Sequence, residues 1–272
     1  MKSEDISIPR TSLRILLLQM DIAWGDKKKN IAYIEDQIEK QGKDADLIVL
    51  PEMCTTGFCT RSLLYAETDE EETIQSFKQI AYSHGVALAG SFMQKDSNAD
   101  VFHNRAFLIT PTGEYFYSDK RHLFRMGAEH ELFSPGQTLT ICAYKGWNIA
   151  LFVCYDLRFP VWSRNVHSKY DLAIYVANWP ASRIHVWDTL LAARAIENQA
   201  YICGVNRVGQ DAELISYNGH SALFSPYGKP LLQLTSPTDL SGSASIDLES
   251  LQKFRQKFPV WKDADSFIFQ DK

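Results

Sequence analysis

The chain has few cysteines and no long apolar run, and each shortage excludes a class of protein. Five cysteines occur among 272 residues, and no two of them form a Cys-x-x-Cys pair. This small, odd number does not suit a disulfide scaffold and favours a reducing compartment. No apolar run is long enough to cross a bilayer, and residues 1–12 are polar, without the apolar centre of a signal peptide. We therefore expect a cytoplasmic protein without a membrane partner, with residues 1–12 as a loose N-terminal arm.

The chain also lacks a concentration of positive charge. The formal net charge is −5, and the one basic cluster, residues 27–29, follows Asp26 and is typical of a solvated helix start. A nucleic-acid partner would need a basic face or stripe, so none is expected. No His or Cys cluster has the spacing of a metal site, so no metal is expected either. A small molecule is the expected partner.

Short apolar runs alternate with amphipathic stretches, which indicates an α/β fold. A hairpin-rich middle separates two such series, with Pro111-Thr112-Gly113 as a turn signal and no helix expected between 101 and 145. We predict one domain over 1–272, a four-layer αββα sandwich of two mixed sheets packed face to face with helices outside. The predicted strands are 14–22, 45–52, a run from Val86, 104–110, 114–118, 147–156 and 171–180. The predicted helices are 31–38, 70–84, 160–168, 184–199 and a stretch from Leu248, with a further hairpin near 225–228.

Cys154 is the candidate nucleophile. It ends the apolar run 149–153 and precedes Pro160, where we expect a helix to begin because proline suits a first helical turn. A cysteine at such an elbow would be exposed, and a nearby helix N-terminus would lower its pKa. The alternative is a small buried core residue. Cys142 and Cys203 lie in apolar strands and are interpreted as core residues. Cys54 and Cys59 lie in a loop, and their role stays open.

Glu52 and Lys120 each follow a predicted strand end. The carboxylate of Glu52 would be half-buried, which suits a general acid or base, although an ordinary loop-capping carboxylate fits equally well. Lys120 lies between Asp119 and Arg121 and, in isolation, is typical of surface charge. Together with Cys154, however, the two supply what a thiol nucleophile needs, namely a base and a cation for the oxyanion.

The segments around these residues resemble the nitrilase superfamily of carbon–nitrogen hydrolases. LIVLPEM surrounds Glu52, DKRHLF surrounds Lys120 and VCYDLRFP surrounds Cys154. Further similar segments are AEHELFSPG (128–136), ANWP (177–180) and LLAARAIENQAYICGVNRVG (190–209), so the resemblance covers nearly the whole chain in order. Within the superfamily, ANWP and CYDLRFPVWSRN are most similar to omega-amidases, also called 2-oxoglutaramate amidases.

This resemblance implies two sheets between helix layers and a catalytic triad of Glu52, Lys120 and Cys154. A second family glutamate matches Glu129, with Glu131 as a nearby competitor. The implied reaction cleaves the side-chain amide of a small keto-dicarboxylic acid monoamide, 2-oxoglutaramate or 2-oxosuccinamate, through a thioester and without a metal or organic cofactor. A homodimer or higher homo-oligomer is implied as well.

The substrate carries a carboxylate in this interpretation, so an arginine is expected near Cys154. Arg158 is the preferred clamp, because a guanidinium group matches a carboxylate with two parallel hydrogen bonds. Arg183 is the alternative, and Arg158 could equally be structural, pairing with Asp156 or Glu197. Phe58, Trp179 and Tyr155 are expected either to line the pocket or to pack in the core. The backbone N–H of Tyr155 is expected to donate a hydrogen bond to the oxyanion.

Other functions stay open on the sequence alone. A nitrilase or an N-carbamoyl amino acid hydrolase would use the same triad. From a different class, the chain could be a non-catalytic scaffold, although intact Glu52, Lys120 and Cys154 count against that hypothesis. A thiol-redox sensor would need Cys54 or Cys59 to lie over Cys154 as a resolving cysteine.

Overall fold

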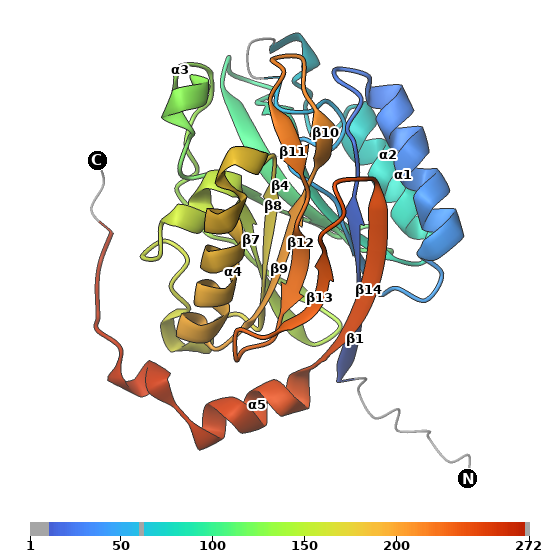
Figure 1. Cartoon of the computed structure of the whole chain (residues 1–272). Coiled ribbons are helices and arrows are strands. Elements are labelled where there is room, and N and C mark those ends of the chain that lie inside the picture. The colour runs from blue at the N-terminus through green and yellow to red at the C-terminus, as the bar shows by residue number, and fades with distance from the viewer. Residues whose placement is uncertain (1–10, 60–62, 270–272) are drawn as a thin grey trace.

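Two six-stranded sheets form the centre of the molecule, and a two-stranded ribbon (orange) lies at the top of the view in Figure 1. The computed structural model describes residues 11–59 and 63–269. The first sheet has the order β14-β1-β2-β3-β4-β5. Its strands are β1 (Ser12–Gln19), β2 (Leu47–Val49), β3 (Ala87–Lys95), β4 (Phe102–Ile109), β5 (Tyr115–Asp119) and β14 (Leu240–Asp247). β1, β2 and β3 run parallel and the other pairings are antiparallel, so the sheet is mixed.

The second sheet is mixed in the same way and has the order β13-β12-β9-β8-β7-β6. Parallel pairing joins β7, β8 and β9, and antiparallel pairing joins the rest. Its strands are β6 (Ile141–Tyr144), β7 (Trp147–Val153), β8 (Leu172–Ala177), β9 (Tyr201–Asn206), β12 (Ser221–Phe224) and β13 (Pro230–Leu234). The ribbon consists of β10 (Val208–Gln210) and β11 (Ser216–Asn218).

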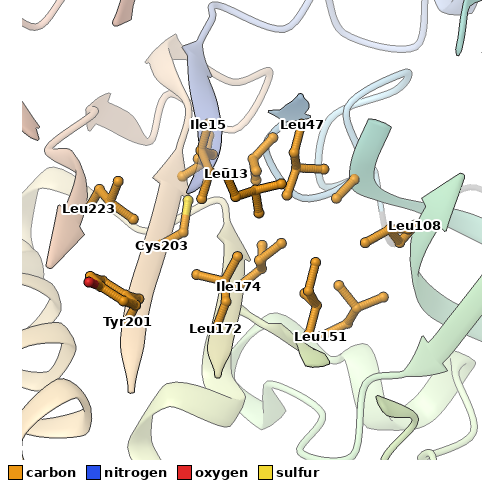
Figure 2. Packing of buried hydrophobic residues seen from close by; sticks show 14 of the residues in the cluster. Leu13, Ile15, Leu47, Leu108, Leu151, Leu172, Ile174, Tyr201, Cys203 and Leu223 are labelled. Atoms are coloured by element: carbon orange, nitrogen blue, oxygen red, sulfur yellow. The ribbon is translucent and has the colours of Figure 1, made fainter. Parts of the chain in front are cut away.

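The main apolar core lies between the two sheets. Side chains alternate along a strand, so every second residue of β1 faces this core, including Leu13 and Ile15. Figure 2 shows both residues opposite Leu172, Ile174 and Cys203 from the second sheet. Burial of two facing apolar surfaces therefore fixes the sheets against each other.

Helices cover the outer faces of both sheets, which confirms the four-layer sandwich. α1 (Lys27–Gln41) and α2 (Glu72–His84) pack on the first sheet through residues such as Ile34 and Phe77. α4 (Ile184–Asn198) packs on the second sheet through Trp187 and Leu191. The other helices are α3 (Glu129–Leu132) and α5 (Leu248–Lys257). Within residues 11–59 and 63–269, none of these helices combines the length and the apolar character that a bilayer span requires.

The expected helix over 160–168 is wrong. The 3-10 turn η3 (Cys154–Arg158) ends before this segment, no helix begins at Pro160, and the segment itself contains turns and one short 3-10 turn, η4 (Val166–Ser168). Leu157 and Trp162 are nevertheless buried on the second sheet, so their apolar spacing reflects packing of an irregular segment. The short α3 also lies in the stretch 101–145, where no helix is expected from the sequence.

Both predicted hairpins are present, as β4–β5 and β12–β13. The single-domain organisation and the loose arm stay predictions. Residues 1–10 lie outside the described residues, and Ser12 already opens β1.

Candidate active site

Cys154 lies at a strained elbow directly after β7. Its backbone φ is 44°, in the left-handed region that residues other than glycine rarely adopt. The buried carboxylate of Asp156 stabilises this elbow, accepting hydrogen bonds from Val153 N at 3.2 Å and from His122 N at 3.0 Å. His122 follows Lys120 by two residues, so one carboxylate connects the two chain segments. The strain is maintained by this local network.

Glu52 is fully buried and its carboxylate accepts several hydrogen bonds. Oε1 accepts from Asn104 Nδ2 at 2.7 Å and from Lys120 Nζ at 2.9 Å. Oε2 accepts from the backbone N of Asn178 at 2.8 Å. The thiol of Cys154 lies 4.0 Å from the backbone carbonyl oxygen of Asn178 and lines the same pocket as Glu52. These contacts place the carboxylate beside the thiol and the ammonium group.

Lys120 is buried between two carboxylates. Its Nζ lies 2.9 Å from Glu52 Oε1 and 2.9 Å from Glu129 Oε2. Burial alone would lower the pKa of Lys120, but the charges of Glu129 and Glu52 offset this and keep it above its usual value. Glu131 is exposed, so the structure brings Glu129 and not Glu131 to the lysine.

The pKa of Cys154 is raised, contrary to the expectation from the sequence. Burial raises it well above the usual thiol value, the charge of Glu52 raises it further, and Lys120 only partly offsets both effects. In the described chain no helix begins at Pro160, and η3 is only a short 3-10 turn, so the helix N-terminus expected to lower the pKa is missing. The resting group is therefore a thiol, and it needs a base to become a nucleophile.

A pocket of about 180 Å³ opens onto these groups. Arg158 and Arg183 line it, and their guanidinium groups lie over the rings of Trp179 (5.2 Å) and Phe124 (5.5 Å). Phe58 and Tyr155 are also part of the lining, with Phe58 5.4 Å from Lys120 Nζ. Trp179 lines the pocket and also packs against Trp187. Both roles considered for this residue, pocket lining and core packing, are therefore present.

The structural partners suggested for Arg158 are occupied elsewhere. Asp156 accepts from His122, and Glu197 pairs with Arg194 at 2.9 Å. Among the described residues, no carboxylate lies within ion-pair distance of Arg158 or Arg183. Within residues 11–59 and 63–269, neither guanidinium group forms an ion pair, although Asp211 and Glu213 also line the pocket.

Several residues near the site were not singled out from the sequence. Asn104 contacts both buried glutamates, and Asn178 donates from its backbone and side chain to Glu52. Tyr217 lines the pocket, donates to Asp211 at 2.8 Å and packs on Arg207. The sequence around Asn104 is the polar triplet His103-Asn104-Arg105 at the start of strand 102–109, which does not single out Asn104.

Within the described parts of the chain, no group of three or more His, Cys, Asp or Glu side chains is arranged to hold a metal ion.

Comparison with known proteins identifies the family. The family model "Carbon-nitrogen hydrolase" matches residues 14–256, which is most of the chain. The chain belongs to the carbon-nitrogen hydrolase family. This carbon-nitrogen hydrolase is an enzyme that acts on carbon–nitrogen bonds other than peptide bonds.

Curated relatives of this hydrolase include two bacterial amidases. The chain is 41% identical to "Omega-amidase YafV" of Escherichia coli (strain K12) over 256 residues, which cover 94% of this chain and 98% of that protein. It is 33% identical to "2-oxoglutaramate amidase" of Bacillus subtilis (strain 168), covering 92% of this chain and 96% of that protein.

Solved structures support the same assignment. The structure of XC1258 from Xanthomonas campestris, a CN-hydrolase superfamily protein with an arsenic adduct in its active site, matches with a TM-score of 0.91 and 36% identity. That match covers 95% of this chain and 99% of XC1258. A mutant of the amidase from Nesterenkonia sp. AN1, with acrylamide added to its active-site cysteine, matches with a TM-score of 0.76 and 25% identity, over 91% of this chain and 98% of that one.

Proposed function

We propose that this hydrolase is an omega-amidase with Cys154 as its nucleophile. It cleaves the side-chain amide of 2-oxoglutaramate or 2-oxosuccinamate to the acid and ammonia. The observation that carries the proposal is that Glu52, Lys120 and Cys154 line one pocket together with Arg158 and Arg183, with Lys120 Nζ 2.9 Å from Glu52 Oε1. The similarity to proteins called omega-amidase and 2-oxoglutaramate amidase supports the choice of substrate.

The first half of the reaction forms a thioester. Glu52 accepts the thiol proton as Cys154 Sγ attacks the amide carbonyl. An ammonium group has three hydrogens, so Lys120 has one left for the oxyanion after donating to Glu52 and Glu129. The backbone N–H of Tyr155, at the first turn of η3, has no partner within that turn and supplies a second donor. Glu52 then protonates the leaving nitrogen, the C–N bond breaks and ammonia departs.

The second half hydrolyses the thioester. Glu52 takes a proton from water, with Glu129 as the alternative base, and the hydroxide adds to the thioester carbonyl. Collapse of this intermediate breaks the C–S bond and releases the acid, and the thiolate regains a proton from the glutamate. Glu129 otherwise holds Lys120 in place through its 2.9 Å contact. None of these steps requires a cofactor.

Arg158 is the proposed clamp for the substrate carboxylate, with Arg183 as the second candidate. Both are half-buried in the pocket, where a guanidinium–carboxylate pair is shielded from water. The pocket volume of about 180 Å³ suits a small metabolite. Trp179 and Phe124 hold the guanidinium planes, and Phe58 closes the wall beside Lys120.

Ammonia release separates the proposed function from its relatives in the same family. Pure protein is assayed with 2-oxoglutaramate, glutamine, a simple nitrile and an N-carbamoyl amino acid. We expect turnover of the keto acid amide to exceed the others, and no turnover by Cys154→Ala. Cys142→Ala, at a cysteine buried between the sheets, is the matched control and keeps its activity. A nitrile or carbamoyl compound as the best substrate would replace the proposal with a nitrilase or carbamoylase.

The protein is further proposed to be a cytoplasmic homodimer or higher homo-oligomer. Exposed apolar side chains beside the C-terminal end of α4 support the oligomer, since Val161 is 54%, Ile196 57% and Phe258 60% exposed. Single exposed apolar residues are ordinary, but several on neighbouring segments indicate a contact surface. Sedimentation velocity of the wild type and of Ile196→Glu tests this, and a monomeric wild type contradicts it.

A further inference from the structure

Asn104, in β4, lies between the two buried glutamates. Its Nδ2 is 2.7 Å from Glu52 Oε1 and 3.0 Å from Glu129 Oε1. An amide nitrogen carries two hydrogens, so each carboxylate receives one of them. Lys120 Nζ lies 2.9 Å from the same Glu52 oxygen and 3.0 Å from the same Glu129 oxygen. The two carboxylates are therefore bridged twice, once by an ammonium group and once by a neutral amide.

A chain of hydrogen bonds from β3 fixes the orientation of this amide. Met53 N donates to Ser91 Oγ at 2.9 Å, and Ser91 Oγ donates to Asn104 Oδ1 at 3.0 Å. Because ionised carboxylates only accept hydrogen bonds, Nδ2 faces the glutamates, and Oδ1 accepts from the serine hydroxyl. The backbone carbonyl of Asn104 also accepts from Lys120 N at 2.9 Å. One residue thus holds both acids and the lysine backbone.

The charges explain why a neutral donor is needed here. Glu52 and Glu129 are fully buried, and Lys120 is the one cation among the described residues that contacts them. Two carboxylates on shared donors repel each other, which favours protonation of one of them. Burial raises the pKa of Glu129 and the charge of Glu52 raises it too, whereas the charge of Lys120 and, to a smaller extent, the hydrogen bond from Asn104 lower it. An amide N–H stabilises both anions without adding charge.

We propose that Asn104 is a positioning residue that keeps Glu52 and Glu129 ionised together around Lys120, so that Glu52 can accept the thiol proton. This inference rests on the proposed function, because it assigns a base role to Glu52. It concerns the carboxylate pair alone and is independent of which amide is the substrate.

Asn104→Asp tests the proposal with almost no change in shape. The substitution replaces the donor with an acceptor and puts a third carboxylate beside the pair, so the cluster takes up a proton. A raised carboxyl pKa means that the ionised form is lost at higher pH. The acid-side fall of kcat/KM should therefore move upward by about one to two pH units, the size expected for a lost hydrogen bond to a charged group. Lys120, Cys154 and Tyr217 also face the cluster and are unchanged in this variant.

Ser91→Ala is the second variant and the milder one. It frees Oδ1, allows the amide to rotate, and should move the acid limb in the same direction by less. Because it adds no charge, it decides the matter if Asn104→Asp does not fold. The proposal would be overturned if each of these two variants that folds kept the wild-type acid limb, that is, the acid-side fall of kcat/KM, with kcat/KM within twofold of wild type.

Asn165→Asp is the matched control. Asn165 is buried, and its Nδ2 also donates to two acceptors, Tyr170 O at 2.9 Å and Asn198 O at 3.1 Å. It makes no contact with the glutamate pair, so its variant should lose stability and keep the wild-type acid limb. An equal shift of the limb in Asn165→Asp would show that general destabilisation, not the carboxylate pair, moves it.

Alkylation of Cys154 by iodoacetamide as a function of pH gives a readout that does not use an amide. Removal of the thiol proton by Glu52 should give alkylation the same acid limb as hydrolysis, with the same upward shift in Asn104→Asp. A shifted alkylation limb without hydrolysis of any amide leaves this inference standing and rejects the proposed function. Hydrolysis of 2-oxoglutaramate by the wild type, with no shift of either acid limb in Asn104→Asp, supports the proposed function and rejects this inference.

Discussion

Replacing Lys120 by Met should lower both the free energy of unfolding and kcat, each for a different physical reason. The side chain is 1% exposed and its ammonium group is the shared partner of Glu52 and Glu129. Removing one partner from a buried ion pair leaves an uncompensated charge and costs about 3–5 kcal/mol of folding free energy. That is a large part of the about 5–15 kcal/mol that stabilises a typical protein.

The same variant should lose turnover through the oxyanion. The loss of one preorganised donor lowers kcat by about 10² to 10³. The stability deficit depends on pH, and its sign follows from the carboxyl groups. Burial already raises the pKa of Glu129 in the wild type, and without the lysine charge the pKa rises further. A carboxyl group with a raised folded-state pKa destabilises the protein above that pKa, so the deficit shrinks as the pH falls through it.

Urea denaturation at several pH values measures the deficit, and adding Glu129→Gln to Lys120→Met tests its cause. The double variant removes one uncompensated charge, so it should regain much of the stability at neutral pH and none of the activity. A Lys120→Met protein as stable as wild type at neutral pH would refute the reasoning. So would a deficit that stays the same between neutral and acidic pH, or one that Glu129→Gln does not reduce.

Three further predictions concern the pocket, the elbow and the core. Arg158→Lys should raise KM for 2-oxoglutaramate far more than for a neutral amide, because a lysine cannot form the paired contact; equal changes would remove the clamp role. Asp156→Asn should lower kcat by about tenfold or more with little change in KM, because it loosens the link between the elbow and His122; Asp188→Asn, which breaks a similar contact to His220 (3.0 Å), should not, and equal losses would contradict the positional role. Ile174→Ala should lower the free energy of unfolding by about 2–5 kcal/mol while kcat of the folded enzyme is kept, and thermal melting with activity assays checks both.

Much of the sandwich could be predicted because its strands are buried on both faces or alternate regularly. The apolar run 14–22 predicts a strand, and the structure has β1 over Ser12–Gln19. The turn Pro111-Thr112-Gly113 predicts a hairpin, and the structure has it as β4–β5. The prediction of a helix over 160–168 was wrong because the apolar spacing of this segment fits both a helix and an irregular packed segment. Only the neighbouring sheet determines which of these forms.

That Glu52, Lys120 and Cys154 lie together could be predicted from the sequence, whereas the electrostatics of this candidate site could not. Glu52, Lys120 and Cys154 follow strands whose ends meet, and a strand end can be read from sequence. The contact of Asn104 with both glutamates could not be read in this way, since it depends on the pairing of β4 with β3 and on the position of α3. The raised pKa of Cys154 likewise results from burial between segments far apart in the chain.

The central claim is that Cys154 carries the acyl group of the substrate during turnover. Rapid quenching of the enzyme with 2-oxoglutaramate, followed by intact-protein mass spectrometry, tests it directly. The account predicts a transient mass increase equal to the substrate minus ammonia, located on the peptide that contains Cys154 and absent in Cys154→Ala. Ammonia release at the wild-type rate by Cys154→Ala, or an adduct on another residue, would contradict it.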